Sequence, residues 1–241
     1  MRSRFIYDFV RRHISLVVLV LAGLSHFSLT IYLRANLSAV GFGQVSMFFT
    51  VLAMMWSFGL LGSEQSFLRH ARLVNSTQIT ISPQLIRYLI TSALVGAIGF
   101  SISLYHYAPL GKWSLAYFPF SLSLLFVLFL YNYFRLRQSF FWSQCYAGAW
   151  RLLLPLILIP LARFQEISYE AVVLSVMVIV GCAAGIGFIH VITGAKPVVD
   201  RYQQPALLSL TVQFLISLLL LSIFETADRL LVEHLFGIVV A

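Results

Sequence analysis

Apolar residues are gathered into long runs along most of the chain, and short polar connections separate these runs. An α-helix rises about 1.5 Å per residue, so about 20 apolar residues can cross a bilayer core about 30 Å thick. The pattern therefore predicts an all-α, polytopic membrane protein with about seven transmembrane helices. The runs cover residues 14–33, 45–61, 88–107, 115–133, 142–161, 171–193 and 207–224.

Two of these runs have poorly marked boundaries. The second run is short, and the fifth contains Gln144 and Arg151. The first run follows four arginines, as a secretory signal would, but its 20 residues exceed a typical signal core and no small-residue cleavage site closes it. We therefore expect the first run to remain in the protein as a spanning helix.

Composition agrees with this pattern. Of the 241 residues, 60% are hydrophobic and 10% are charged, whereas about a quarter of residues are charged in soluble domains. The net charge of +8 comes from basic residues that are spread over the connections. That spacing favours a role in membrane topology and argues against a nucleic-acid partner.

Lysines and arginines are divided unequally between alternate connections. The N-terminus carries four lysines and arginines, the second connection three, the fourth three if Arg151 is included, and the sixth two. These four segments lie on one side of the membrane and carry 12 basic residues together, whereas the other side carries 4. Cytoplasmic connections carry the excess of basic residues in membrane proteins. The sequence thus predicts a cytoplasmic N-terminus and a C-terminus on the periplasmic side of a bacterial inner membrane.

Motifs for catalysis or cofactor binding are absent from the sequence. The six histidines form no HExxH pair, Cys145 and Cys182 stand far apart, and no Gly-x-Ser-x-Gly segment occurs. We expect no enzyme activity, no cofactor and no metal site.

Several polar side chains fall inside or at the ends of the apolar runs. A polar group in hydrocarbon needs a partner or water, so these side chains should face the helix bundle. Arg34 and Arg151 could instead meet an anionic lipid head group, although Arg34 could also extend to the outer surface. The polar residues inside the runs are His26, Asn132, Gln144, Arg151, His190 and Gln213.

The last run is followed by a dense group of charges. Residues 207–224 carry no charge, and Glu225, Asp228, Arg229 and Glu233 come directly after them. Glu225 and Arg229 are four residues apart and can pair on one face of a helix. Two interpretations stay open: a self-neutralising charge cluster at the membrane surface, or a polar cavity at membrane depth.

Two segments carry motifs that belong together. The first runs over residues 33–70 and the second over residues 227–237. In this order and spacing they resemble the polysaccharide and O-antigen (lipopolysaccharide) flippases of the multidrug, oligosaccharidyl-lipid and polysaccharide exporter superfamily. The matching residues are Leu37, Gly41, Phe42, Gly59, Leu60, Gly62 and Arg69 in the first segment, and Asp228, Arg229, Leu230, Leu231, Phe236 and Gly237 in the second.

The resemblance implies two six-helix lobes that face each other across a central cavity. Through this cavity a polyprenyl-pyrophosphate-linked oligosaccharide crosses the inner membrane by alternating access. The chain would supply the N-terminal half: a six-helix lobe over residues 1–204, and the seventh helix with the start of a second lobe over residues 205–241. We expect a truncated flippase-like transporter that pairs with itself or with a separately encoded second half.

For transport, the candidate substrate-binding residues are Arg34, Arg69, Glu225, Asp228 and Arg229. The arginines would attract the pyrophosphate, and the acids would partner them or a coupling cation. Arg69 is explained equally well by topology, and Glu225 with Arg229 by a surface ion pair. The alternative function is that of a non-transporting membrane remnant or an accessory subunit.

Overall fold

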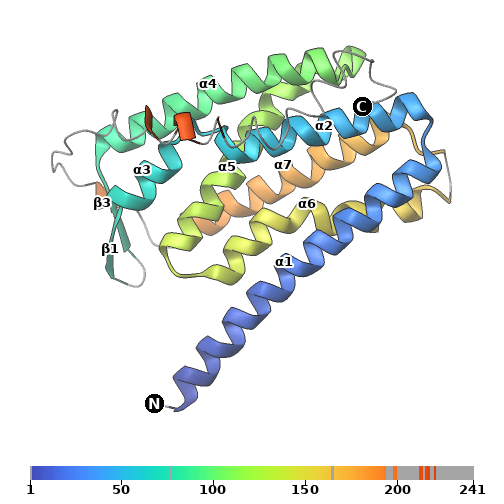
Figure 1. Ribbon diagram of the computed structural model, residues 1–241. Helices are drawn as coiled ribbons and strands as arrows, with labels where there is room; N and C mark the ends of the chain where they lie inside the picture. The colour runs from blue at the N-terminus through green and yellow to red at the C-terminus, as the bar shows by residue number, and fades with distance from the viewer. Residues whose placement is uncertain are drawn as a thin grey trace.

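The computed structural model is a bundle of long helices with a small sheet at one end (Figure 1). It describes residues 2–75, 78–163, 166–193 and 198–199, together with helical residues 212–213, 215–217 and 220. The helices are α1 (Arg2–Asn36), α2 (Ala39–Phe58), α3 (Ser63–His70), α4 (Pro83–Tyr107), the 3-10 helix η1 (Gly111–Ala116), α5 (Tyr117–Leu136), α6 (Phe140–Leu161) and α7 (Tyr169–Thr193).

Five helical segments in the described part of the chain are long and apolar enough to cross a membrane, and the bent helix α6 makes a sixth. The prediction of a helical, multi-pass membrane protein is therefore confirmed. The first six predicted runs fall on α1, α2, α4, α5, α6 and α7. Most of the seventh run, and with it Glu225, Asp228 and Arg229, lies outside the described residues.

Serine side chains begin two of the spanning helices. Ser38 precedes α2, and its hydroxyl accepts a hydrogen bond from the backbone N–H of Gly41 at 3.1 Å. Ser82 precedes α4 and accepts from Leu85 N–H at 3.2 Å, with Pro83 in the first turn. Such caps satisfy N–H groups that have no partner within the helix, which fixes where each helix begins.

Successive long helices run in opposite directions (Figure 1). The α1–α2 turn, η1 and the α6–α7 connection therefore lie at one end of the bundle, and α3, the sheet and the α5–α6 turn at the other. Arg151 lies inside α6, so it does not belong to the fourth connection. Without Arg151, the connections on the N-terminal side carry 11 lysines and arginines instead of 12, and those on the other side carry 4. The asymmetry therefore remains.

The sheet combines two strands of the second connection with one strand that follows α7, and the sequence shows no strand pattern at either place. Strands β1 (Arg72–Asn75) and β2 (Gln78–Ile81) pair antiparallel, and β3 (Val198–Val199) joins β2 in parallel. Ile79 and Ile81 of β2 are buried, at 1% and 6% exposure. Strands of four residues are too short to show a periodicity in the sequence, so their side-chain burial becomes visible only in the structure.

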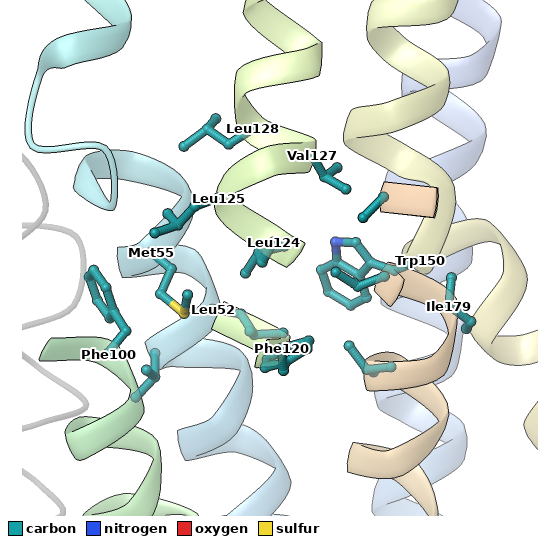
Figure 2. Close-up of a cluster of buried hydrophobic side chains, with 14 of the residues drawn as sticks. Leu52, Met55, Phe100, Phe120, Leu124, Leu125, Val127, Leu128, Trp150 and Ile179 are labelled. Atoms are coloured by element: carbon teal, nitrogen blue, oxygen red, sulfur yellow. The ribbon is translucent and has the colours of Figure 1, made fainter. Parts of the chain in front are cut away.

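Helix α5 lies at the centre of the bundle. Its buried residues, which include Phe120, Leu124 and Val127, point in more than one direction around the helix. Figure 2 shows them between Leu52 and Met55 of α2 on one side and Trp150 of α6 on the other. The core is thus a helix-on-helix core around α5, and Trp150 connects it to the α1–α6 face.

Candidate functional site

Helix α1 packs along α6 (Figure 1). Small residues lie at this contact. A Cβ atom built on Gly148 of α6 would lie 3.0 Å from Cβ of Ala22 on α1, and Ala22 is 2% exposed. Small side chains let two helix backbones approach closely within lipid. Because the two helix backbones approach closely at Ala22, Ser25 and His26, which lie about one turn further along α1, pack directly against α6.

A proline in α6 creates a polar group that α1 satisfies. Pro155 has no backbone N–H, so it cannot donate to the carbonyl of Arg151 four residues earlier. The hydroxyl of Ser25 on α1 donates to that carbonyl oxygen instead, at 2.8 Å. Because an unsatisfied carbonyl is costly in a membrane, this hydrogen bond sets the register of α1 against α6.

Three rings, one from each of three helices, meet beside this hydrogen bond. We call His26 of α1, Phe49 of α2 and Trp150 of α6 the aromatic triad. The ring centroid of His26 lies 5.1 Å from that of Phe49 and 5.3 Å from that of Trp150, both in edge-on geometry. Phe49 and Trp150 are 5.6 Å apart. Edge-on aromatic pairs at these distances are favourable, so the triad is a preorganised surface.

The guanidinium group of Arg151 lies against the triad. Its Cζ atom is 5.2 Å from the centroid of the Trp150 ring, within the range of a cation–π contact. Arg151 is half-buried, and its Nε is buried without a hydrogen-bond partner in the described part of the chain. The helix bends by 42° between Phe140–Gly148 and Trp150–Leu161, so Arg151 follows the bend directly.

Two cavities open beside these side chains. One of about 110 Å³ is lined by His26, Phe49, Trp56, Trp150 and Arg151, with apolar residues of α2 and α5. The other, of about 440 Å³, lies between α1 and α2 and shares His26 and Phe49 with the first. Two triad members, His26 and Phe49, therefore form the common wall of both cavities, and Trp150 lines the smaller one.

This arrangement suits an anion attached to an apolar or sugar-like group. Two unit charges 4 Å apart interact by about 4 kcal/mol at an effective dielectric constant of about 20, so a cation at this depth attracts an anion strongly. The rings offer flat surfaces for stacking, and the imidazole can take part in hydrogen bonds. Among the described residues, no group of three or more His, Cys, Asp or Glu side chains could hold a metal ion.

The two described candidates from the sequence lie far from each other. Arg34 is exposed at the end of α1, where its Cζ is 5.2 Å from the centroid of the Phe42 ring. Arg69 lies on α3 at the opposite end of the bundle. The 20 residues of α2 separate these ends by about 30 Å. The other candidates, Glu225, Asp228 and Arg229, lie outside the described residues.

Two further polar residues of the spans lie within the helix bundle. Asn132 is 2% exposed, and its side-chain amide donates to the carbonyl of Leu128. His190 lies 3.4 Å from the hydroxyl oxygen of Tyr146, atom Nδ1 to Oη, and its ring packs against Phe134. The position of Asn132 agrees with the expectation that such groups turn inward, whereas His190 is only partly buried and Gln213 is exposed.

Sequence reasoning noted Arg151 and His26 separately and did not join them into a site. The triad combines residues from three helices, which no local spacing connects. A useful signal was present, however: an arginine inside an apolar run, followed four residues later by a proline. Comparison of the chain with protein-family models, with curated proteins and with solved structures found no match.

Proposed function

We propose that this chain is a flippase-like membrane transporter for lipid-linked oligosaccharide, serving polysaccharide export across a bacterial inner membrane. The N-terminus lies in the cytoplasm and the C-terminus in the periplasm. The bundle forms one wall of the transport cavity. The substrate is a polyprenyl-pyrophosphate-linked oligosaccharide.

The observation that carries this proposal is Arg151. Within the described residues its Nε has no partner, yet the side chain lies in the middle of an apolar span. An arginine at the centre of a spanning helix costs about 2.5–3.5 kcal/mol on insertion scales and more in simulations, so such residues are rare outside functional sites. A pyrophosphate that reaches Arg151 offsets this cost with charge-assisted hydrogen bonds.

The neighbouring surfaces fit the other parts of the substrate. Sugar rings have apolar faces that can stack on the aromatic triad, of which His26 and Phe49 border the larger cavity. The polyprenyl chain needs a hydrocarbon environment beside the cavity. Helix α1 provides one, because Leu24, Phe27 and Ile31 are 58%, 65% and 57% exposed along its outer face.

Complementation of a flippase-deficient bacterial strain tests the proposal. The chain is expressed alone, surface polysaccharide is scored, and the amount of protein in the membrane is measured in parallel. Restored polysaccharide supports transport by an assembly of this chain. Failure at normal membrane levels, both alone and with a second-lobe protein, favours the alternative of a non-transporting accessory subunit.

Variants at the site sharpen this test. Arg151→Ala should abolish export and Arg151→Lys should retain part of it, since lysine keeps the charge and loses the planar donor fork. Arg163→Ala is the matched control, because Arg163 is exposed in the connection after α6. Asp228→Asn and Arg229→Ala should also abolish export at normal membrane levels. Full export by these two variants would remove Asp228 and Arg229 from the site.

A further inference from the structure

The chain breaks sharply between α2 and α3. Gly59 ends α2, and the next residues turn through left-handed backbone conformations, with φ of 52° at Leu61 and 77° at Gly62. Glycine adopts this conformation readily, whereas leucine does so at a cost in energy. The turn directs the first turn of α3 inward, against α4 and α5.

That first turn carries a buried acid. Glu64 is 6% exposed, and Ser63 before it and Ser66 two residues after it are fully buried. The carboxyl oxygen Oε2 of Glu64 is buried without a hydrogen-bond partner in the described part of the chain. The backbone N–H groups of Gly62 and of Glu64 itself are directed toward the carboxyl group. An ionised carboxylate with so few partners is strongly disfavoured in such surroundings.

The face of α3 that carries Glu64 is packed against α5. Phe67, three residues after Glu64 and therefore on the same side of the helix, is fully buried and contacts Phe129 of α5 with ring centroids 5.1 Å apart. This contact holds the face of α3 that carries Glu64 against α5. Hydration of the whole carboxyl group therefore calls for α3 to move away from α5.

No charged side chain in the described part of the chain compensates Glu64. Burial disfavours the charged form of its carboxyl group and two backbone N–H groups favour it, and Oε2 has no hydrogen-bond partner among those residues. The titratable or charged residues on the elements packed around it are Arg69 and His70 on α3, Arg87, Tyr88, Tyr105, His106 and Tyr107 on α4, and Tyr117, Tyr131, Tyr133 and Arg135 on α5, with Arg137 directly after it.

We propose that Glu64 is a proton-binding site that controls the packing of α3. With a proton on Oε2 the carboxyl group is neutral, and α3 packs against α4 and α5. When the O–H bond breaks and water accepts the proton, the carboxylate requires hydration, so the first turn of α3 moves out toward solvent. The α2–α3 break, which already departs from helical geometry, allows this movement. The site acts whether or not the chain transports a lipid-linked sugar.

Infrared spectroscopy of the purified full chain in lipid tests the proton directly. A protonated carboxylic acid gives a carbonyl-stretch band that a carboxylate lacks. We expect this band at neutral pH in the unmodified protein, its loss in Glu64→Gln, and its retention in Glu170→Gln, where the exposed Glu170 serves as the matched control. Absence of the band at neutral pH, or a band that Glu64→Gln leaves unchanged, overturns the proposal.

Thiol labelling tests the movement of α3. Ser66→Cys places a near-isosteric thiol on the buried face of α3, and its labelling rate is measured from about pH 6 to about pH 9, a range that covers raised carboxyl titrations. Every thiol reacts faster as it ionises, so the same cysteine is measured with Glu64→Gln. We expect the rate to rise more steeply with Glu64 than with glutamine. Equal slopes overturn the control of α3 packing.

Discussion

Removal of the Ser25 hydroxyl should destabilise the protein much more when Pro155 is present than when alanine replaces it. In the native chain the Ser25 hydroxyl donates to the Arg151 carbonyl oxygen at 2.8 Å, because Pro155 has no N–H to offer. Ser25→Ala leaves that carbonyl unsatisfied. Pro155→Ala restores an N–H at the position from which an ordinary helix would bond the same carbonyl.

The magnitude follows from the environment of this carbonyl. Interhelical hydrogen bonds in membranes contribute about 0.6 kcal/mol on average and up to about 1.7 kcal/mol. A buried carbonyl left without any partner costs about 1–3 kcal/mol. We therefore expect Ser25→Ala to lower the free energy of unfolding by about 1–2 kcal/mol in the native background. In the Pro155→Ala background we expect a decrease of only a few tenths of a kcal/mol. The coupling energy between the two positions is then about 1 kcal/mol.

Equilibrium unfolding in mixed micelles, followed by far-ultraviolet circular dichroism, measures all four members of the cycle. Ser28→Ala is the matched control, because Ser28 lies on the same helix and is exposed. It should change the unfolding free energy little in either background. An equal effect of Ser25→Ala with proline and with alanine at position 155 would refute the explanation of how α1 and α6 are aligned.

Two further predictions concern packing and topology. Gly96→Ala should destabilise the protein by about 1–3 kcal/mol, since its Cβ would clash with the backbone oxygen of Gly59. Gly99→Ala, with open space around it, should unfold like the native protein. Equal unfolding free energies for these two variants would contradict the α2–α4 packing. Arg34→Cys and Arg69→Cys should react with a membrane-impermeant thiol reagent from opposite sides, periplasmic and cytoplasmic respectively, in cells and inverted vesicles. Labelling of both from one side would contradict the crossing of the membrane by α2, which separates the two positions.

The helical membrane fold could be predicted because lipid imposes strong rules on sequence. A spanning segment must be long and apolar, so the runs at 14–33 and 171–193 correspond directly to α1 and α7. The break between α2 and α3 was harder to predict from the sequence. Glycines at positions 59 and 62 mark it, but Leu61 also takes a left-handed conformation, which the sequence does not signal.

The candidate site was less predictable than the fold because it depends on which helices meet. The sequence favoured charged residues near motifs, and it selected Arg34 and Arg69 at opposite ends of the bundle. Arg151 acquires its surroundings only when α1 lies along α6 and brings His26 to Trp150. The hydrogen bond that aligns these helices joins residues 126 positions apart, so periodicity within one run cannot reveal the site.

The central claim is that Arg151 recognises an anionic lipid-linked substrate. The most direct test is to measure the binding of a polyprenyl pyrophosphate to the purified chain in lipid nanodiscs. The corresponding polyprenyl alcohol, which lacks the anion, is the reference ligand, and protein with Arg163→Ala is the control. The native chain should prefer the pyrophosphate, and Arg151→Ala should weaken its binding about tenfold or more, because a charge-assisted hydrogen bond contributes about 1.5–3 kcal/mol. Equal affinity of the native chain and Arg151→Ala for the pyrophosphate would contradict the assignment of this site.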